Sequence, residues 1–449
     1  MRVLSEAFPA EEFAARRARV LDRIGAGAQA LVQGAGPVRG FEVFRQTNEC
    51  FYLCGIEVPQ AYLLLDGGAR TTTLFLPHRD PHAGSEGDVL SAEDADEIRT
   101  QTGIDAVFGL EELGGRLRDD AAAVYTPHSP AEGRLASRDE LLRSAKAVAA
   151  DPWDAAPGRE ERLAERLRER RPGVEVRDLT PILDEMRITK SPREIEVMRR
   201  AGRLCALAVA EAMRSTRAGL FEYQVGAVAD YLYSVNGARG YAYRPIIACG
   251  ENIWYSHYFR NDSPLRDGEL VLMDVAPDVH NYTSDIGRMW PVSGRYSPLQ
   301  RELYGLVVEY HKALLRRIRP GALPGQVLAE AADDMRPVIE RTPFSKPIYE
   351  QAARRLLDFK GHLSHPVGMA VHDVGNYLDR PMEPGLVFAL DPQMWVPEER
   401  LYIRVEDTVA VTETGVEVLT NAAPLELDAV EAVMREDGLL QKLPPLEVA

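Results

Sequence analysis

Residues 270–290 limit the folds open to this chain more than any other stretch. They begin with the apolar run Leu-Val-Leu-Met, which predicts a buried strand, and place Asp274 within it. A turn at residues 277–281 follows, and a second short run then carries Asp285. A buried carboxylate is costly unless it is paired, protonated or bound to a metal ion. If the two carboxylates lie on facing strands of a hairpin, one or two bound cations would neutralise their charges. Two solvated aspartates at a sheet edge explain this stretch equally well.

The length and net charge of the chain limit the classes of protein to which it can belong. Its 449 residues suggest two or three domains. A formal net charge of -16 argues against nucleic acid or an anionic membrane as the main partner. The sequence has no secretory signal and no apolar run long enough to span a bilayer. Its four cysteines form no Cys-x-x-Cys pair. We therefore expect a soluble protein of the reducing cytoplasm.

The order of apolar and charged runs predicts an α/β chain of two domains. The first domain, residues 1–176, alternates helices with short strands, and Asp66-Gly67-Gly68 fits a hairpin turn. Predicted helices cover residues 10–24 and 159–171, and predicted strands begin at residues 30, 51, 61, 71, 123 and 174. The second domain, residues 177–449, opens a long helix with Ser191-Pro192-Arg193-Glu194, a capping box. Its last third is predicted to be mostly strands, at residues 366–371, 386–390, 401–411 and 417–420.

The predicted strand at residues 401–411 carries charges on both faces. Strand periodicity puts Arg404 and Glu406 on one face and Asp407 on the other. A surface ion pair of Arg404 with Glu406 would be worth little. The strand is so apolar, however, that we expect it to be central and its charged face to line a cleft.

Three histidines, His362, His365 and His372, gather near glycine and proline residues. An odd number of residues separates His365 from His372, so a regular strand would send the two side chains to opposite faces. They can reach one site only where Pro366 or Gly368 breaks the pleat. Periodicity alone leaves both arrangements open.

Asp391 ends a further apolar run and completes a set of possible metal ligands, which are Asp274, Asp285, His365, Asp391 and Glu406. Four carboxylates and one imidazole suit two hard divalent ions. We expect manganese in first place, with cobalt or zinc as the other candidates. The shortage of cysteines excludes a thiolate-rich structural zinc site.

The sequence resembles, over nearly its whole length, the aminopeptidase P, prolidase and creatinase family of pita-bread fold proteins. The resemblance rests on motifs at residues 45–55, 186–196, 256–261, 284–288, 365–375 and 404–407. It implies a creatinase-like α/β domain followed by a pita-bread catalytic domain. It also implies that Asp285 and Glu406 bridge two ions, that Asp274 serves one ion, and that His365 and Asp391 serve the other.

The same resemblance implies the roles of the remaining residues. His257 and His372 would bind substrate or stabilise the tetrahedral intermediate, and Arg404 would orient a substrate carboxylate or carbonyl. Asp391 would pass a proton from water to the leaving nitrogen. The chain departs from the family at two places. Asp391-Pro392-Gln393 stands where Glu-Pro-Gly is usual, which shortens the carboxylate by about 1.5 Å. His362 stands one position from the family's histidine and is a candidate substitute for it on the substrate side.

We therefore expect hydrolysis of an Xaa-Pro bond, at a peptide amino terminus or in a dipeptide, through a hydroxide that bridges two metal ions. One alternative is an amidohydrolase of the same fold that acts on a non-peptide or modified amino-acid amide. Another is a non-catalytic protein that binds peptides in the same cleft. From the family we also expect a homo-oligomer, with a dimer as the first possibility.

Overall fold

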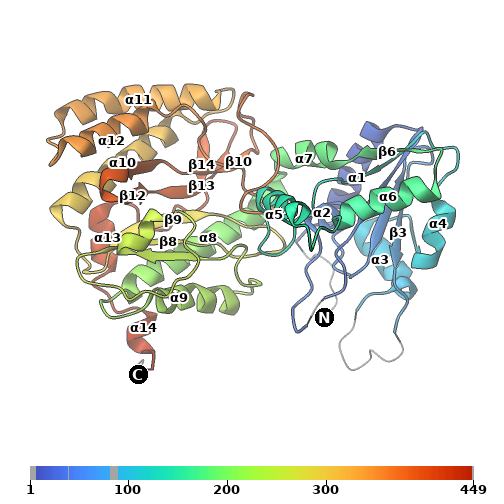
Figure 1. Ribbon diagram of the computed structural model, residues 1–449, viewed down its shortest axis with the longest axis horizontal. Helices are drawn as coiled ribbons and strands as arrows, with labels where there is room; N and C mark the ends of the chain where they lie inside the picture. The colour runs from blue at the N-terminus through green and yellow to red at the C-terminus, as the bar shows by residue number, and fades with distance from the viewer. Residues whose placement is uncertain (1–6, 39, 81–88, 447–449) are drawn as a thin grey trace. The chain divides into compact units, whose positions relative to one another are not determined.

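The computed structural model describes residues 7–38, 40–80 and 89–446, and the chain divides into two compact units, Met1–Arg187 and Ile188–Ala449 (Figure 1). The division lies at Arg187 rather than at residue 176, because helix α7 (Thr180–Ile188) is tied to the first unit. The Tyr52 hydroxyl donates to the Met186 carbonyl at 3.1 Å, and Arg187 pairs with Glu132 at 2.7 Å. The sequence before residue 7, where we expect no secretory signal, lies outside the described residues.

The first unit is built on a mixed six-stranded sheet in the order β4-β3-β2-β1-β5-β6. Strand β2 pairs antiparallel with β1 and β3, whereas the β1–β5, β3–β4 and β5–β6 pairs are parallel. The strands are β1 (Ala28–Gln33), β2 (Tyr62–Asp66), β3 (Thr71–Leu76), β4 (Ala106–Gly109), β5 (Ala123–Thr126) and β6 (Glu175–Asp178). The remaining helices are α1 (Ala10–Ile24), α2 (Asn48–Cys54), α3 (Ala95–Thr102), α4 (Leu113–Arg116), α5 (Arg138–Ala150) and α6 (Arg159–Arg170). The predicted hairpin turn is confirmed, since Asp66 accepts hydrogen bonds from the Gly68 and Ala69 amides.

The strand predicted to begin at residue 51 is wrong, because this segment is helix α2. The Thr47 side chain accepts a hydrogen bond from the Cys50 amide at the start of the helix, and Gly55 ends it at a φ of 67°. Every residue of α2 is buried. A short helix that is buried on all sides has no polar face, so its apolar run cannot be distinguished from a buried strand by periodicity.

The second unit contains a five-stranded antiparallel sheet in the order β10-β13-β9-β8-β7, with β14 added to β13. Its strands are β7 (Ile246–Cys249), β8 (Leu270–Asp274), β9 (Ile286–Pro291), β10 (Val387–Leu390), β13 (Glu406–Val411) and β14 (Val416–Val418). Strands β11 (Gln393–Val396) and β12 (Leu401–Arg404) form a separate two-stranded sheet.

Helices lie on both sides of the sheets in the second unit (Figure 1). Helices α8 (Pro192–Ser215) and α9 (Glu222–Val235) lie on one side, and α10 (Pro298–Arg317), α11 (Pro324–Arg341) and α12 (Pro347–Asp358) on the other. Two short helices, α13 (Leu427–Val433) and α14 (Leu439–Lys442), complete the unit. The predicted capping box is confirmed, because Ser191 accepts from the Glu194 amide and Glu194 accepts from the Ser191 amide. No helix in the described part of the chain has the length and apolarity needed to cross a bilayer.

Two predicted strands differ from the structure. Residues 401–411 are not one strand, because the chain passes at Val405 from β12 in the small sheet to β13 in the large one. Residues 366–371 form an irregular loop, in which a bridge from Pro366 to Phe388 is the remaining strand-like contact. The Asp373 amide donates to the Pro366 carbonyl, so the loop closes on itself.

Candidate metal centre

Strands β8 and β9, which form the hairpin, and the neighbouring strand β13 bring three carboxylates together. Asp274 ends β8 opposite Gly287, and Asp285 directly precedes β9. Glu406 begins β13 and also lies opposite Gly287. The Thr408 hydroxyl accepts from the Asp285 amide at 2.6 Å, which fixes Asp285 beside β13. All three carboxylates are buried, so the edge-aspartate interpretation of the hairpin is wrong.

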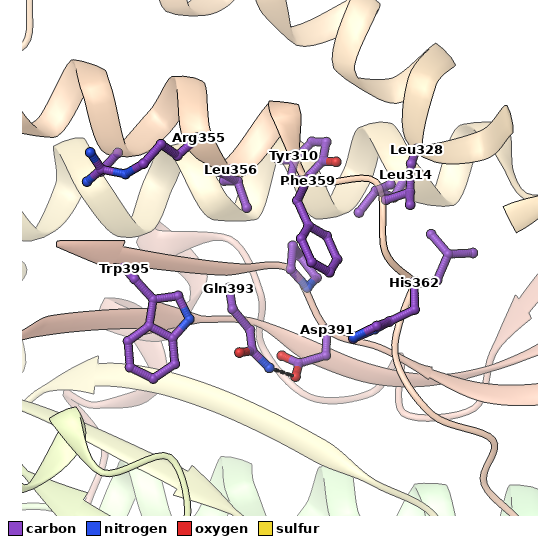
Figure 2. A pocket seen from close by; sticks show the side chains of 13 residues that line it. Tyr310, Leu314, Leu328, Arg355, Leu356, Phe359, His362, Asp391, Gln393 and Trp395 are labelled. Atoms are coloured by element: carbon purple, nitrogen blue, oxygen red, sulfur yellow. Dashed lines mark hydrogen bonds between the residues drawn. The ribbon is translucent and has the colours of Figure 1, made fainter. Parts of the chain in front are cut away.

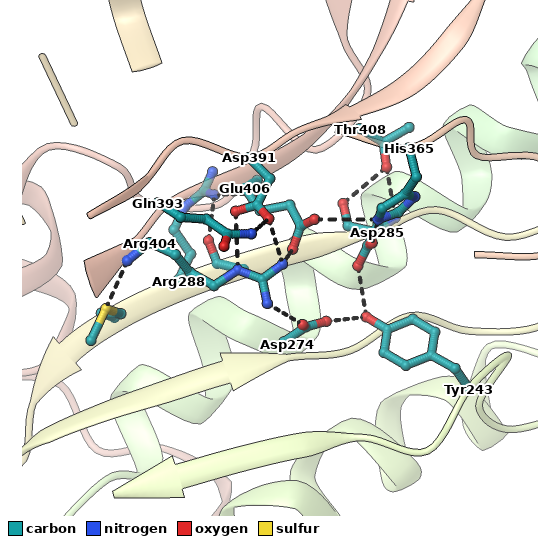
Figure 3. A network of polar contacts seen from close by, with 12 residues as sticks. Tyr243, Asp274, Asp285, Arg288, His365, Asp391, Gln393, Arg404, Glu406 and Thr408 are labelled. Atoms are coloured by element: carbon teal, nitrogen blue, oxygen red, sulfur yellow. Dashed lines mark hydrogen bonds and ion pairs between the residues drawn. The ribbon is translucent and has the colours of Figure 1, made fainter. Parts of the chain in front are cut away.

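The Tyr243 hydroxyl lies between two of these carboxylates. It contacts Asp274 and lies 2.7 Å from Asp285 Oδ1 (Figure 3). Burial, and then the charges of Asp274 and Asp285, raise the pKa of Tyr243 well above its usual value, so the hydroxyl stays protonated. A hydroxyl has one hydrogen and cannot donate to both carboxylates at once. The other carboxylate therefore needs a second partner, and Arg404 is that partner for Asp274.

His365 completes a group of side chains that could hold a metal ion. Its Nε2 atom lies 3.5 Å from Asp285 Oδ2 and 3.8 Å from Glu406 Oε1. One ligand atom from each of the three residues lies within 4.8 Å of the others. Glu406 Oε1 is buried and has no hydrogen-bond partner among the described residues. Since such an atom is rarely left unsatisfied, the three side chains fit a cation between them.

The electrostatics of this group favour the same interpretation. Burial, and then Asp274, raise the pKa of Asp285 well above its usual value. Burial also raises the pKa of Glu406, although Arg404 opposes this. Burial, assisted by His372 and Arg404, lowers the pKa of His365 to about 3. His365 is therefore a neutral imidazole, the form that binds metals, and a divalent cation would offset the cost of the buried carboxylates.

Arg404 is the cation at the centre of the polar cluster (Figure 3). Its guanidinium lies 2.7 Å from Asp274, contacts Glu406, and meets both oxygens of Asp391 at 3.1 Å each. The Gln393 side chain also donates to Asp391. One guanidinium cannot balance four carboxylates, which leaves room for added positive charge. The expected role of Arg404 toward substrate has no counterpart in these contacts, since the guanidinium is engaged with protein carboxylates.

The histidines fall into two groups. The ring of His365 lies 4.2 Å from that of His372, which lies 6.0 Å from that of His257. His365 and His372 reach the same place because residues 366–371 are irregular, as a break at Pro366 or Gly368 requires. His362 belongs elsewhere. Its ring packs edge-on against Phe359, and it lines a cavity with Asp391 and Gln393 (Figure 2).

Tyr243 is a polar group of the site that sequence reasoning missed, and the contact of Gln393 with Asp391 was not predicted either. Tyr243 stands in an irregular stretch before β7 and belongs to no charged or periodic pattern. Gln393 follows Asp391 and Pro392 directly, so its departure from the family's glycine was the available signal.

Known proteins resemble this chain over most of its length. Residues 196–413 match the model of metallopeptidase family M24, and residues 13–125 match that of the aminopeptidase P N-terminal domain. The chain is 32% identical to the Xaa-Pro aminopeptidase of Escherichia coli K12 over 94% of this chain and 97% of that protein. It is 27% identical to the mitochondrial intermediate cleaving peptidase 55 of Arabidopsis thaliana over 94% of this chain and 83% of that protein.

A solved structure agrees with these matches. The structure of E. coli aminopeptidase P with the inhibitor Pro-Leu superposes with a TM-score of 0.77 at 29% identity, and the match covers 95% of this chain and 98% of that one. The chain belongs to metallopeptidase family M24. The expected order of an amino-terminal α/β domain and a pita-bread catalytic domain is confirmed.

Proposed function

We propose that this metallopeptidase removes the first residue of peptides whose second residue is proline. Three buried carboxylates, Asp274, Asp391 and Glu406, meet the guanidinium of Arg404, and Asp285 and a neutral His365 lie beside Glu406. This cluster carries the proposal. Such a cluster is costly in a folded protein unless cations complete it. The Xaa-Pro specificity is taken from the relatives, which are named Xaa-Pro aminopeptidases.

The donor set supports two divalent ions, for which we propose manganese, with cobalt or zinc as the alternatives. Asp274, Asp285, His365, Asp391 and Glu406 are the residues that would hold the ions. When bound, the ions supply Lewis-acid activation of water and of the substrate carbonyl.

The side chains around these ligands have separate proposed tasks. Cleavage of the amide transfers a proton from water to the leaving proline nitrogen, and Asp391 is the proposed carrier because Arg404 and Gln393 fix its carboxylate. His257 and His372 are proposed to bind the substrate carbonyl oxygen, where negative charge develops as water attacks. The contacts of Arg404 support a positioning role through Asp391 in place of direct substrate binding. His362 is proposed to contact substrate from the side of the cavity that it lines.

We propose further that the protein acts in the cytoplasm as a homo-oligomer, with a dimer as the first possibility. The free, buried cysteines Cys50, Cys54, Cys205 and Cys249 support a reducing compartment.

Metal analysis combined with a peptide assay tests the proposed function. The purified protein incubated with Mn²⁺ should hold two ions per chain and hydrolyse Ala-Pro-Ala but not Ala-Ala-Ala. Asp285→Asn should lose metal and activity, whereas Asp262→Asn, a matched change at an exposed carboxylate, should keep both. A protein that binds two ions but cleaves no Xaa-Pro peptide would favour the amidohydrolase alternative. A protein that binds peptide but no metal would favour the non-catalytic one.

A further inference from the structure

Lys190 and Asp373 form a buried ion pair in the second unit. Lys190 Nζ lies 3.2 Å from Asp373 Oδ2, and both side chains are 1% exposed. We propose that this pair positions His372, and that the reaction needs the charges of the pair as well as its packing. The inference rests on the proposed function, because that function places His372 at the substrate carbonyl oxygen.

Stability alone does not call for charges at this place. Two buried charges lose their hydration, and neutral side chains of similar volume often stabilise a fold equally well or better. Removing one partner is costly, however, because the other charge is then left buried. In our proposal, the ion pair serves to fix one arrangement of the two chain segments that carry it.

Backbone contacts fix the position of Lys190. Its amide donates to the Gly385 carbonyl at 2.8 Å, and a Cβ atom added at Gly385 would lie 2.8 Å from the Lys190 carbonyl oxygen, so the two segments touch. The Gly385 amide donates in turn to the carbonyl of Val411, the last residue of β13. Lys190 is therefore tied to the strand that begins with Glu406.

The other member of the pair, Asp373, closes an irregular loop. Its amide donates to the Pro366 carbonyl at 2.9 Å, and the Thr283 amide donates to the Gly368 carbonyl at 2.8 Å. The Asp373 carboxylate covers the middle of this loop, because a Cβ atom added at Gly368 would lie 2.0 Å from Asp373 Oδ2. The ion pair therefore holds the closed loop against the segment that carries Lys190.

His372 directly precedes Asp373, so its backbone moves with the ion pair. Its ring lies 4.2 Å from the ring of His365 and 6.0 Å from that of His257. A displacement of about 1 Å at a group that contacts the reacting atoms can lower a rate by about 100-fold. Lys190 and Asp373 are thus positioning residues, whose loss should reach the reaction through His372.

A double-mutant cycle tests this path. Lys190→Met keeps the length of the side chain and removes its charge. In the Mn²⁺-loaded protein it should lower kcat for Ala-Pro-Ala about tenfold and leave KM within about twofold, because the misplaced group acts in the transition state. In a His372→Ala background the same substitution should have no further effect on kcat, since the residue that the pair positions is absent. A contact that serves stability alone would lower kcat by the same factor in both backgrounds or leave it unchanged.

A second variant separates the effect of charge from that of folding. Lys190→Met alone leaves Asp373 buried without its cation, which destabilises the fold. The double variant, Lys190→Met with Asp373→Asn, removes both charges, so it should melt close to the wild-type temperature and still show about a tenfold loss of kcat. Lys312→Met is the matched control, because it breaks a lysine–glutamate pair of 2.8 Å between α10 and Glu426.

Hydrogen exchange gives a readout that does not depend on turnover. The amides of Gly368 and Asp373 are bonded within the loop, and mass spectrometry of a peptide covering residues 366–375 follows their exchange. The double variant should exchange these amides about tenfold faster than the wild type, because the loop opens more often once the pair is lost. Lys312→Met should leave the exchange unchanged.

The two proposals fail in different ways. If Xaa-Pro peptides are cleaved but the double variant keeps the wild-type kcat, the pair does not position His372 and the proposed function stands. Equal losses of kcat with and without His372 overturn the inference as well. If no Xaa-Pro peptide is cleaved, the proposed function is wrong, and exchange then decides whether the pair orders the loop. Unchanged exchange in the double variant overturns that part too.

Discussion

Arg404 holds Asp391 with two nitrogen–oxygen distances of 3.1 Å, while another of its nitrogens lies 2.7 Å from Asp274. The planar guanidinium thereby fixes the relative positions of two carboxylates, one at the end of β8 and one directly after β10. Asp391 has one methylene fewer than the glutamate usual in the family, so its reach depends on how it is held. The fork geometry of Arg404 supplies that constraint.

Arg404→Lys tests this constraint. A lysine keeps the charge but offers a point-like ammonium that cannot span both oxygens of Asp391 and reach Asp274. We expect kcat for Ala-Pro-Ala to fall about 100-fold, the order of loss that a misplaced catalytic group produces, with two Mn²⁺ ions retained. Arg336→Lys, at an exposed position on α11, is the control. Unchanged kcat in Arg404→Lys would show that Asp391 is held without the fork.

Glu406→Gln should change stability in opposite directions with and without metal. Burial raises the pKa of Glu406, so its contribution to stability is present below the usual pKa of a glutamate and is lost as pH rises through the folded-state pKa. At neutral pH the metal-free variant should therefore melt higher, by about 2 to 4 °C for each ~1 kcal/mol gained. With saturating Mn²⁺ the order should reverse, because the wild-type protein alone gains the full binding energy.

Thermal melts with a chelator and with Mn²⁺, each at several pH values, measure both effects. The control is Glu398→Gln, at a half-exposed carboxylate outside the cluster. If Glu406→Gln lowers the melting temperature of the metal-free protein at neutral pH, the carboxylate is stabilised by its protein contacts alone.

Asp407 points to the opposite side of β13 and has a structural role. It lies 2.7 Å from Arg288 and 3.2 Å from His311, and it accepts from Thr420. Burial alone would raise its pKa, but Arg288 and His311 outweigh burial and lower the pKa below the usual range. Asp407→Asn leaves Arg288 buried without its partner and should cost about 3 kcal/mol of unfolding free energy at neutral pH.

The pH dependence of that loss is specific. A carboxylate whose pKa is lowered in the folded state, such as Asp407, stabilises the fold above its unfolded-state pKa, which is near 4. This stabilisation is lost as the pH falls toward the folded-state pKa. Urea unfolding at about pH 7 and about pH 3 should therefore show a smaller difference between Asp407→Asn and wild type at the lower pH. An equal difference at both values would mean that the lost contacts do not depend on the charge of Asp407.

Gly368→Ala should disturb the loop that carries His372. A Cβ atom at Gly368 would lie 2.0 Å from Asp373 Oδ2 and 2.8 Å from Lys190 Cε. The Lys190 and Asp373 side chains are both 1% exposed and lie 3.2 Å apart, so neither can move freely. We expect a loss of about 2 kcal/mol in stability and about tenfold in kcat. Gly325→Ala, on α11 with nothing near its Cβ, should instead stabilise by about 0.5 kcal/mol. Equal effects of the two substitutions would contradict the steric argument.

Asp274, Asp285, His365 and Glu406 show how much of the site the sequence contained. Their residue types and order, together with the family resemblance, predict that the four side chains lie in one site. Arg404 was also identified, but its contacts were not, because strand periodicity gives the face of a residue and not the partners that the tertiary fold brings to it. Tyr243 is separated from Asp285 by 42 residues and carries no charge, so no local pattern indicated it.

The fold was predictable where periodicity or capping was strong. Helix α1 and the start of α8 follow from such signals. Helix α2 could not be predicted in this way, because a helix that is buried on all sides shows no alternation of polar and apolar residues. The break at Val405 was missed because both of its flanking runs are apolar, and pairing partners distant in sequence decide the sheet to which each run belongs.

The small sheet of β11 and β12 has a mechanical consequence. The chain leaves the large sheet at Asp391 and returns to it between Arg404 and Glu406, so polar groups of the site stand at both crossings. The hairpin of β11 and β12 is therefore attached to the rest of the unit beside the carboxylates. Changes in the turn Pro397–Glu399 should be absorbed at its free end. A change at Pro392 or Val405 would instead alter the orientation of the hairpin relative to the large sheet, and with it the spacing of the carboxylates.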